Sequence, residues 1–119
     1  MSSNDSLHDT LAVIDKFTSE REWEQFHTVK NLVASISIEA AELSETVQWT
    51  NPTEGEVLQD EKLVQSISHE LADVMVYCLS LCSKLELDPI QIIHEKMKHN
   101  AEKYPIEKSF GNSKKYSEF

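Results

Sequence analysis

Glycine and proline, the residues that most often interrupt a helix, are almost absent from this chain. Its 119 residues include two glycines and three prolines. Glycine adds backbone freedom and proline removes a helical hydrogen bond, so their scarcity favours long helices with few tight turns. A chain of this length is the usual size of one domain. We therefore predict an all-α fold.

Apolar residues recur at helical spacing in four segments, and no strand-like alternation or internal repeat is present. The predicted helices span about residues 6–20, 28–49, 60–85 and 88–104. Asn4, Asp5 or Ser6 can cap the first, and Asp88-Pro89 places a cap and an N1 proline at the fourth. Four helices with short connections indicate a four-helix bundle-like domain over residues 1–105. Residues 106–119 are expected to form a polar, flexible tail.

The third predicted helix is apolar almost all the way round between Val74 and Cys82. A helix in a small bundle normally keeps one polar face. Burial on every side indicates a subunit interface, so we expect a homo-oligomer.

The charge balance excludes one class of partner. The formal net charge is −10 and the sequence pI is about 4.8. Nucleic-acid binding through phosphates needs a basic surface, so no nucleic-acid partner is expected. A small phosphate ligand can still bind if cations mediate the contact.

Membrane and secreted classes are also disfavoured. The first ten residues lack a basic segment followed by an apolar one, and the longest apolar run is too short to span a bilayer. Cys78 and Cys82, four apart in one helical pattern, are expected to be small core residues rather than a disulfide framework. A cytoplasmic protein without a membrane partner is expected.

Two pairs of acids interrupt the apolar patterns of the second and third helices. Glu39 and Glu42 are three residues apart, as are Glu70 and Asp73. Residues at i and i+3 share one helix face, so each pair projects in one direction. If the two helices pack antiparallel, the pairs can face each other.

Four neighbouring carboxylates repel one another, and removing each from water costs several kcal/mol. A cation among them would compensate, and hard oxygen ligands favour Mg²⁺, with Mn²⁺ as a substitute. The alternatives are solvated acidic faces on a non-catalytic helical protein-interaction module, or a di-iron bundle. The segment from Glu24 to His27 has the Glu-x-x-His form of di-iron proteins, but only one copy occurs.

Four longer motifs resemble the MazG-like superfamily of all-α nucleotide pyrophosphohydrolases, and are closest to its dCTP pyrophosphatase branch. They are EREWEQFH (20–27), KNLVASISIEAAELSETVQW (30–49), HELADVMVY (69–77) and KMKHNAEKYP (96–105). The resemblance covers roughly residues 7–105. It departs from the family pattern at Ile38, where many members have a first glutamate, so the number of metal ions stays open.

The resemblance implies an activity and a site. Such enzymes cleave a nucleoside triphosphate between the α and β phosphates, and they often form tetramers built as paired dimers. By this likeness the chain is a Mg²⁺-dependent house-cleaning enzyme for dCTP or a related or modified deoxynucleotide. The implied metal-binding and catalytic residues are Glu39, Glu42, Glu70 and Asp73. The implied substrate-binding residues are Trp23, His27 and Trp49 for the base, Tyr77 for the deoxyribose, and Lys96 and Asn100 for phosphate or sugar.

Overall fold

The structure is a computed structural model that describes residues 6–119, and these residues contain helices and no strand. The predicted all-α class is therefore confirmed. The chain divides after Glu86 into two compact units, with Leu87–Phe119 forming the second. Each unit is described by itself below. The first carries three of the four long predicted helices, and the second carries the fourth.

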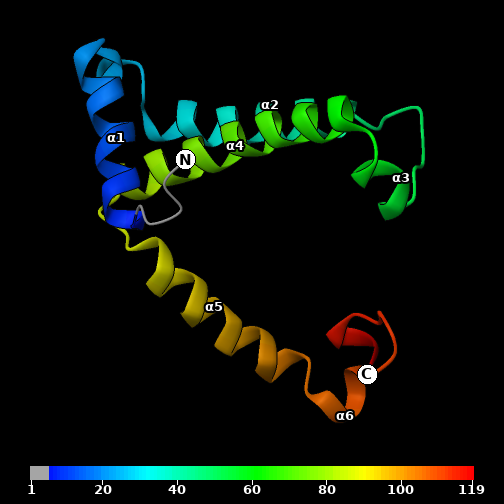
Figure 1. The fold of residues 1–119 in the computed structure, drawn as a ribbon. Helices are drawn as coiled ribbons and strands as arrows, with labels where there is room; N and C mark the ends of the chain where they lie inside the picture. Colours follow the sequence, from blue (N-terminus) through cyan, green and yellow to red (C-terminus); the bar gives the residue numbers. More distant parts are fainter. Residues whose placement is uncertain (1–5) are drawn as a thin grey trace. The chain divides into compact units, whose positions relative to one another are not determined.

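The first unit is built around two long antiparallel helices. Its elements are α1 (Leu7–Glu20), the 3-10 helix η1 (Trp23–Gln25), α2 (Val29–Glu45), α3 (Glu54–Leu58) and α4 (Glu61–Lys84). Figure 1 shows α2 and α4 side by side and running in opposite directions, and α1 also packs against α4. This is the antiparallel arrangement on which the predicted meeting of the acidic pairs depends.

Side-chain caps explain why the long helices begin where they do. Ser6 accepts a hydrogen bond from the Asp9 amide at the start of α1, and Thr28 accepts one from the Asn31 amide at the start of α2. Asp60 caps α4 in the same way. These contacts satisfy amide groups that a helix N-terminus leaves without partners. The proposed alternative caps Asn4 and Asp5 lie outside the described residues.

The region after α2 differs from the prediction. The second helix was expected to continue to Trp49, but it ends at Glu45 and is followed by turns. The Thr46 hydroxyl donates to the Leu43 carbonyl at 2.7 Å, and the next amides bond three residues back, which tightens the chain out of the α-helix.

Helix α3 is a second difference, because no helix is predicted between residues 49 and 60. Thr53 and Glu56 form a reciprocal capping box that starts the five-residue helix. Local hydrogen bonds therefore determine the end of α2 and the start of α3. The spacing of hydrophobic residues gives no information about such bonds.

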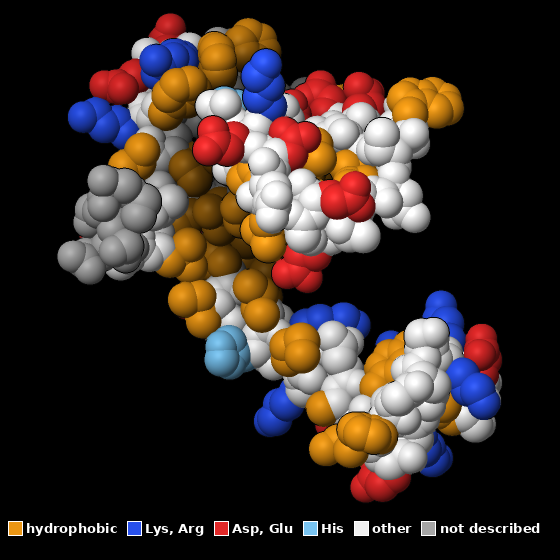
Figure 2. All heavy atoms as spheres, turned by 45° about the vertical axis from the view of Figure 1, so that its right-hand side comes forward, with side chains coloured by type: hydrophobic (Ala, Val, Ile, Leu, Met, Phe, Trp, Pro, Cys, Tyr) orange, Lys and Arg blue, Asp and Glu red, His pale blue; other side chains and the backbone are white. Residues whose placement is uncertain are grey.

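Few apolar side chains are buried in the first unit. Leu32 is 1% exposed and Cys82 is 8% exposed, and these two are the buried hydrophobic residues found in the described part of the chain. On α4, Leu71 and Met75 remain exposed, and α2 leaves Val33 and Ile38 open. Figure 2 shows hydrophobic side chains lying open on the visible face of the molecule. The core is therefore thin along the α2–α4 contact.

The second unit joins one long helix to short ones. It contains α5 (Pro89–Lys103), α6 (Ile106–Ser109) and the 3-10 helix η2 (Tyr116–Glu118). Asp88 caps α5 and Pro89 occupies its first position, as predicted. The Tyr104 ring meets Tyr116 and Phe119 edge-on, with centroids 6.0 and 5.8 Å away. Residues 106–119 thus contain two short helices and contact the end of α5.

Within residues 6–119, no helix combines the length and the hydropathy that crossing a bilayer requires.

Candidate active site

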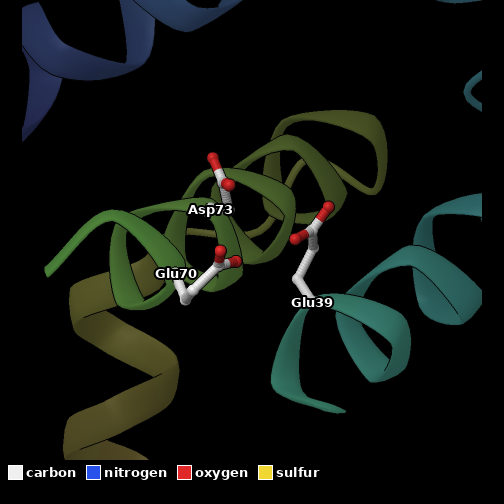
Figure 3. Close-up of side chains that lie close together, drawn as sticks. All are labelled: Glu39, Glu70 and Asp73. Atoms are coloured by element: carbon white, nitrogen blue, oxygen red, sulfur yellow. The ribbon is translucent and has the colours of Figure 1, made fainter. Parts of the chain in front are cut away.

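Three of the four predicted acids meet between α2 and α4. Glu39 extends from α2 toward Glu70 and Asp73, which lie one turn apart on α4 (Figure 3). Each offers a carboxylate oxygen, and these oxygens all lie within 4.8 Å of one another. The i, i+3 spacing and the antiparallel packing together produce this cluster.

The carboxylates are under electrostatic strain. Glu39 and Glu70 each have one buried oxygen without a hydrogen-bond partner. Burial, a hydrogen bond with Glu42 and repulsion from the neighbouring acids raise the pKa of Glu39 to about 7. Burial, a hydrogen bond with Glu42 and repulsion from Glu42 and Asp73 also raise the pKa of Glu70, against a smaller opposite effect of His69. Both shifts mean that the charged cluster lacks a compensating positive charge.

Glu42 takes a different position from the other three. It lies outside the set of oxygens grouped within 4.8 Å, yet it is close enough to hydrogen-bond to both Glu39 and Glu70. Glu42 therefore adds a fourth negative charge beside the cluster and is placed to orient two of its carboxylates.

The donor set fits a hard divalent cation. Carboxylate oxygens are the ligands that Mg²⁺ and Mn²⁺ prefer, and the two unpartnered buried oxygens are the atoms a cation would satisfy. The cluster contains no thiolate or imidazole, which disfavours zinc. Glu24 and His27, the residues of the Glu-x-x-His motif, are not part of it.

An apolar pocket of about 280 Å³, called the aromatic pocket below, lies at the junction of α1, η1 and α4. It brings together Trp23, His27 and Tyr77, three of the residues predicted to bind the nucleoside. The rings of His27 and Tyr77 meet edge-on with centroids 6.3 Å apart. The other lining residues are Val13, Ile14, Phe17, Thr18, Val76 and Ser80.

Sequence reasoning missed the contribution of α1 to this pocket. Phe17 meets Trp23 edge-on at 5.7 Å, and the Arg21 guanidinium lies 3.7 Å from the centre of the Phe17 ring. Phe17 and Ile14 belong to the apolar pattern that predicts the first helix. Helical spacing identifies such a stripe, but it does not say which part of the stripe borders a cavity.

A second, more polar cavity of about 410 Å³ adjoins the first. The two share Thr18, His27 and Ser80. The remaining lining residues of the polar cavity are Asp15, Glu24, Leu32, Ser83, Lys84 and Glu86. Its charged side chains come from α1, from η1, from the last turn of α4 and from the residues that follow it.

Three predicted substrate-binding residues are not brought to these pockets. Trp49 follows the C-terminal end of α2, lines neither cavity and is 87% exposed. Lys96 and Asn100 lie on α5 in the second unit, where the Asn100 amide donates to the Met97 sulfur at 3.7 Å. The roles of these three residues stay predictions.

Comparison with known proteins identifies the class. The chain belongs to the MazG-like family, whose model matches residues 34–119. It is a nucleotide pyrophosphohydrolase of the dCTP pyrophosphatase branch, as the resemblance implied. The mouse protein dCTP pyrophosphatase 1 (Mus musculus) is 34% identical over 114 residues, covering 95% of this chain and 67% of the relative. The human protein of the same name (Homo sapiens) is 32% identical with the same coverage.

A solved structure supports the same assignment. A pyrophosphatase from Archaeoglobus fulgidus aligns with a TM-score of 0.77 and 38% sequence identity. The alignment covers 88% of this chain and 97% of the archaeal one. Fold and sequence therefore agree on the family.

Proposed function

We propose that this chain hydrolyses a pyrimidine deoxynucleoside triphosphate, with dCTP favoured, to the monophosphate and pyrophosphate. The observation that carries the proposal is the acidic cluster of Glu39, Glu70 and Asp73, which shares helix α4 with the aromatic pocket. Tyr77 follows Asp73 by four residues, or about 6 Å along α4. The triphosphate and the nucleoside therefore have adjacent places on one helix face.

The residues of the cluster have defined tasks in this proposal. Glu39, Glu42, Glu70 and Asp73 hold Mg²⁺, as the resemblance implies. Glu42 also lies beside Glu39 and Glu70 and is placed to orient them. When bound, Mg²⁺, or Mn²⁺ in its place, neutralises the triphosphate and favours departure of pyrophosphate. In the metal-free protein, Glu39 holds a proton for part of the time at neutral pH, because its pKa is about 7.

The apolar pocket would bind the nucleoside. Phe17 and Trp23 offer aromatic surface to a base, and the His27 imidazole can hydrogen-bond to a base edge. Tyr77 lies between the acids and the pocket, where it would pack on the deoxyribose and exclude a 2′-hydroxyl. Lys96 and Asn100 are proposed to contact phosphate or sugar, as the resemblance implies.

We further propose a homo-oligomer, with a tetramer of paired dimers expected. The exposed apolar side chains of α2 and α4 support this, because a monomer rarely leaves so many open to water. Trp49 supports it too, because it lies at the opposite end of α2 from His27. In the proposed assembly, Trp49 would therefore contribute to the base pocket of a neighbouring subunit.

Light scattering tests the assembly against the monomer mass of 13.6 kDa. Met75→Glu places a charge on the exposed apolar face of α4, whereas Glu61→Gln changes a charge at the start of the same helix. We expect a multimer that Met75→Glu weakens and Glu61→Gln leaves intact. A monomeric wild-type protein at micromolar concentration would refute the assembly.

The activity is tested by measuring pyrophosphate released from a panel of deoxynucleoside and ribonucleoside triphosphates with Mg²⁺. Asp73→Asn and Glu42→Gln should lower kcat/KM for dCTP by about 100-fold, since a ligand or its orienting partner is lost. Glu45→Gln, one turn beyond Glu42 on α2 and outside the cluster, is the control. Circular dichroism verifies that helicity is retained. Undiminished activity in Asp73→Asn, or pyrophosphate release in excess chelator, would contradict the proposal.

The cellular role of this activity would be house-cleaning of the cytoplasmic nucleotide pool.

A further inference from the structure

The aromatic pocket adjoins the polar cavity. Thr18, His27 and Ser80 line both, so these three side chains lie where the two spaces meet. A ligand in the aromatic pocket therefore has its outer edge next to the polar cavity.

The order of residues along α4 fixes which part of a nucleotide reaches that cavity. From Asp73, Tyr77 lies about 6 Å along the helix, Ser80 about 10 Å and Lys84 about 16 Å. With phosphates at the acids and the base in the aromatic pocket, the base edge opposite the glycosidic bond points toward Lys84. In a pyrimidine, C4 and C5 with their substituents form that edge.

The polar cavity carries an excess of negative charge. Asp15, Glu24 and Glu86 contribute three carboxylates, and Lys84 contributes one ammonium group. None of these four side chains forms an ion pair within residues 6–119. The Ser83 hydroxyl donates to Asp15 at 3.4 Å, which is a long hydrogen bond. The cavity therefore favours a cationic group that these carboxylates can pair with.

Thr18 offers a second, independent feature that a ligand in the polar cavity could use. It is 9% exposed, and its hydroxyl has no hydrogen-bond partner in the described part of the chain. By contrast, the hydroxyl of Thr10 on the same helix donates a hydrogen bond to the Ser6 carbonyl, four residues earlier, at 2.9 Å. Thr18 belongs to the lining of both cavities, so its hydroxyl is available to hydrogen-bond to a ligand there.

We infer that the enzyme accepts pyrimidine deoxynucleoside triphosphates whose base carries, at C4 or C5, a substituent that ends in a basic amine. The ammonium group lies among Asp15, Glu24 and Glu86, and the Thr18 hydroxyl hydrogen-bonds to the substituted base edge. Unsubstituted cytosine leaves the cavity of about 410 Å³ to water. This inference rests on the proposed function and adds a substrate class to it.

The test compares 5-(3-aminoallyl)-dCTP with its N-acetylated derivative, which has the same linker but no charge. Both are assayed for pyrophosphate release beside dCTP. We expect kcat/KM for the amine to exceed that for the acetamide by about tenfold, a discrimination typical of one charged contact. The preference should shrink as salt is raised from about 0.05 to 0.5 M, since the cavity is open to solvent.

The matched variant is the double substitution Asp15→Asn with Glu24→Gln, and Glu20→Gln on the exposed end of α1 is its control. The ratio of the two substrates within each protein is the readout, because it cancels any change in folding or total activity. We expect the ratio to fall to about one-third or less of the wild-type value in the double variant, as for a lost charged hydrogen bond. The control should keep it.

The outcomes separate the two proposals. If no triphosphate in the panel yields pyrophosphate, the proposed function itself fails. If dCTP is cleaved but the amine and the acetamide react equally at both salt concentrations, only the substrate inference fails. A preference for the acetamide would likewise overturn it.

Discussion

Glu39 on α2 and Glu70 on α4 face each other, and each buries a carboxylate oxygen that no hydrogen bond satisfies. Burial and repulsion from neighbouring acids destabilise the charged forms of both side chains. The fold therefore holds a local arrangement that is unfavourable by itself and becomes favourable when a proton or a cation is bound. Protons and divalent cations should compete for this site.

The pH dependence of stability follows from this competition. The pKa of Glu39 is raised to about 7 in the folded protein from 4.5, so protonation favours the folded state. That contribution is fully present below pH 4.5 and is lost as pH rises through 7. In chelator, we expect the thermal midpoint of the wild type to fall between pH 5.5 and pH 8 by more than the midpoint of Glu39→Gln falls. Added Mg²⁺ should raise the midpoint more at pH 8 than at pH 5.5.

Glu39→Gln tests the origin of this dependence, because glutamine resembles the protonated acid. The variant should lose much of the pH dependence and be more stable than the wild type at pH 8 in chelator. It should also gain less stability from Mg²⁺. Glu45→Gln, on the same helix and outside the cluster, should behave as the wild type. An unchanged pH profile in Glu39→Gln would assign the effect to other groups.

Tyr77 is predicted to set the preference for deoxyribose. Its ring meets that of His27 edge-on and lies one helical turn from Asp73. Removing the ring with Tyr77→Ala should open space for a 2′-hydroxyl and narrow the ratio of kcat/KM between dCTP and CTP by about tenfold. Tyr77→Phe keeps the ring and should retain the ratio. Equal ratios in all three proteins would exclude this role.

The acidic cluster was predictable from the sequence because it depends on the regular spacing of residues along two helices. The positions of Glu39, Glu70 and Asp73 on their helix faces follow from 3.6 residues per turn, and the α2–α4 packing follows from their apolar stripes. The cap at Asp88 was predictable because capping depends on a single side chain and a nearby amide.

The pockets were less predictable because they depend on contacts between distant segments. Phe17, Thr18 and Ser80 look like ordinary helix residues, and only the placement of α1 and η1 beside α4 brings them to a common surface. The end of α2 at Glu45 was missed for a different reason, since the Thr46 side chain competes with the helical hydrogen bonds.

The cap of α2 should contribute measurably to stability. Thr28 accepts a hydrogen bond from the Asn31 amide at 3.1 Å, and the helix it starts carries Glu39 and Glu42. Thr28→Ala should lower the free energy of unfolding by about 1 kcal/mol, whereas Thr28→Ser should retain most of it. Chemical denaturation of the oligomer at fixed protein concentration measures the difference. Equal stability of the alanine and serine variants would show that this cap is dispensable.

The turn between α1 and η1 holds Trp23 and Glu24 in place through an unusual backbone conformation. Glu22 adopts φ 53°, in the left-handed region, and its carbonyl accepts a hydrogen bond from the Gln25 side chain at 2.9 Å. This conformation disfavours β-branched side chains strongly, and glycine least.

Glu22→Val should therefore destabilise the protein by about 1–2 kcal/mol and raise KM for the nucleotide, because Trp23 and Glu24 follow the turn directly. Glu22→Gly should change stability by less than about 1 kcal/mol, since relief of the steric cost is offset by greater freedom of the unfolded chain. Glu20→Val, on the regular last turn of α1, controls for the loss of a charge and for helix propensity. If Glu22→Val and Glu20→Val have the same stability and the same KM, the turn does not organise the pocket.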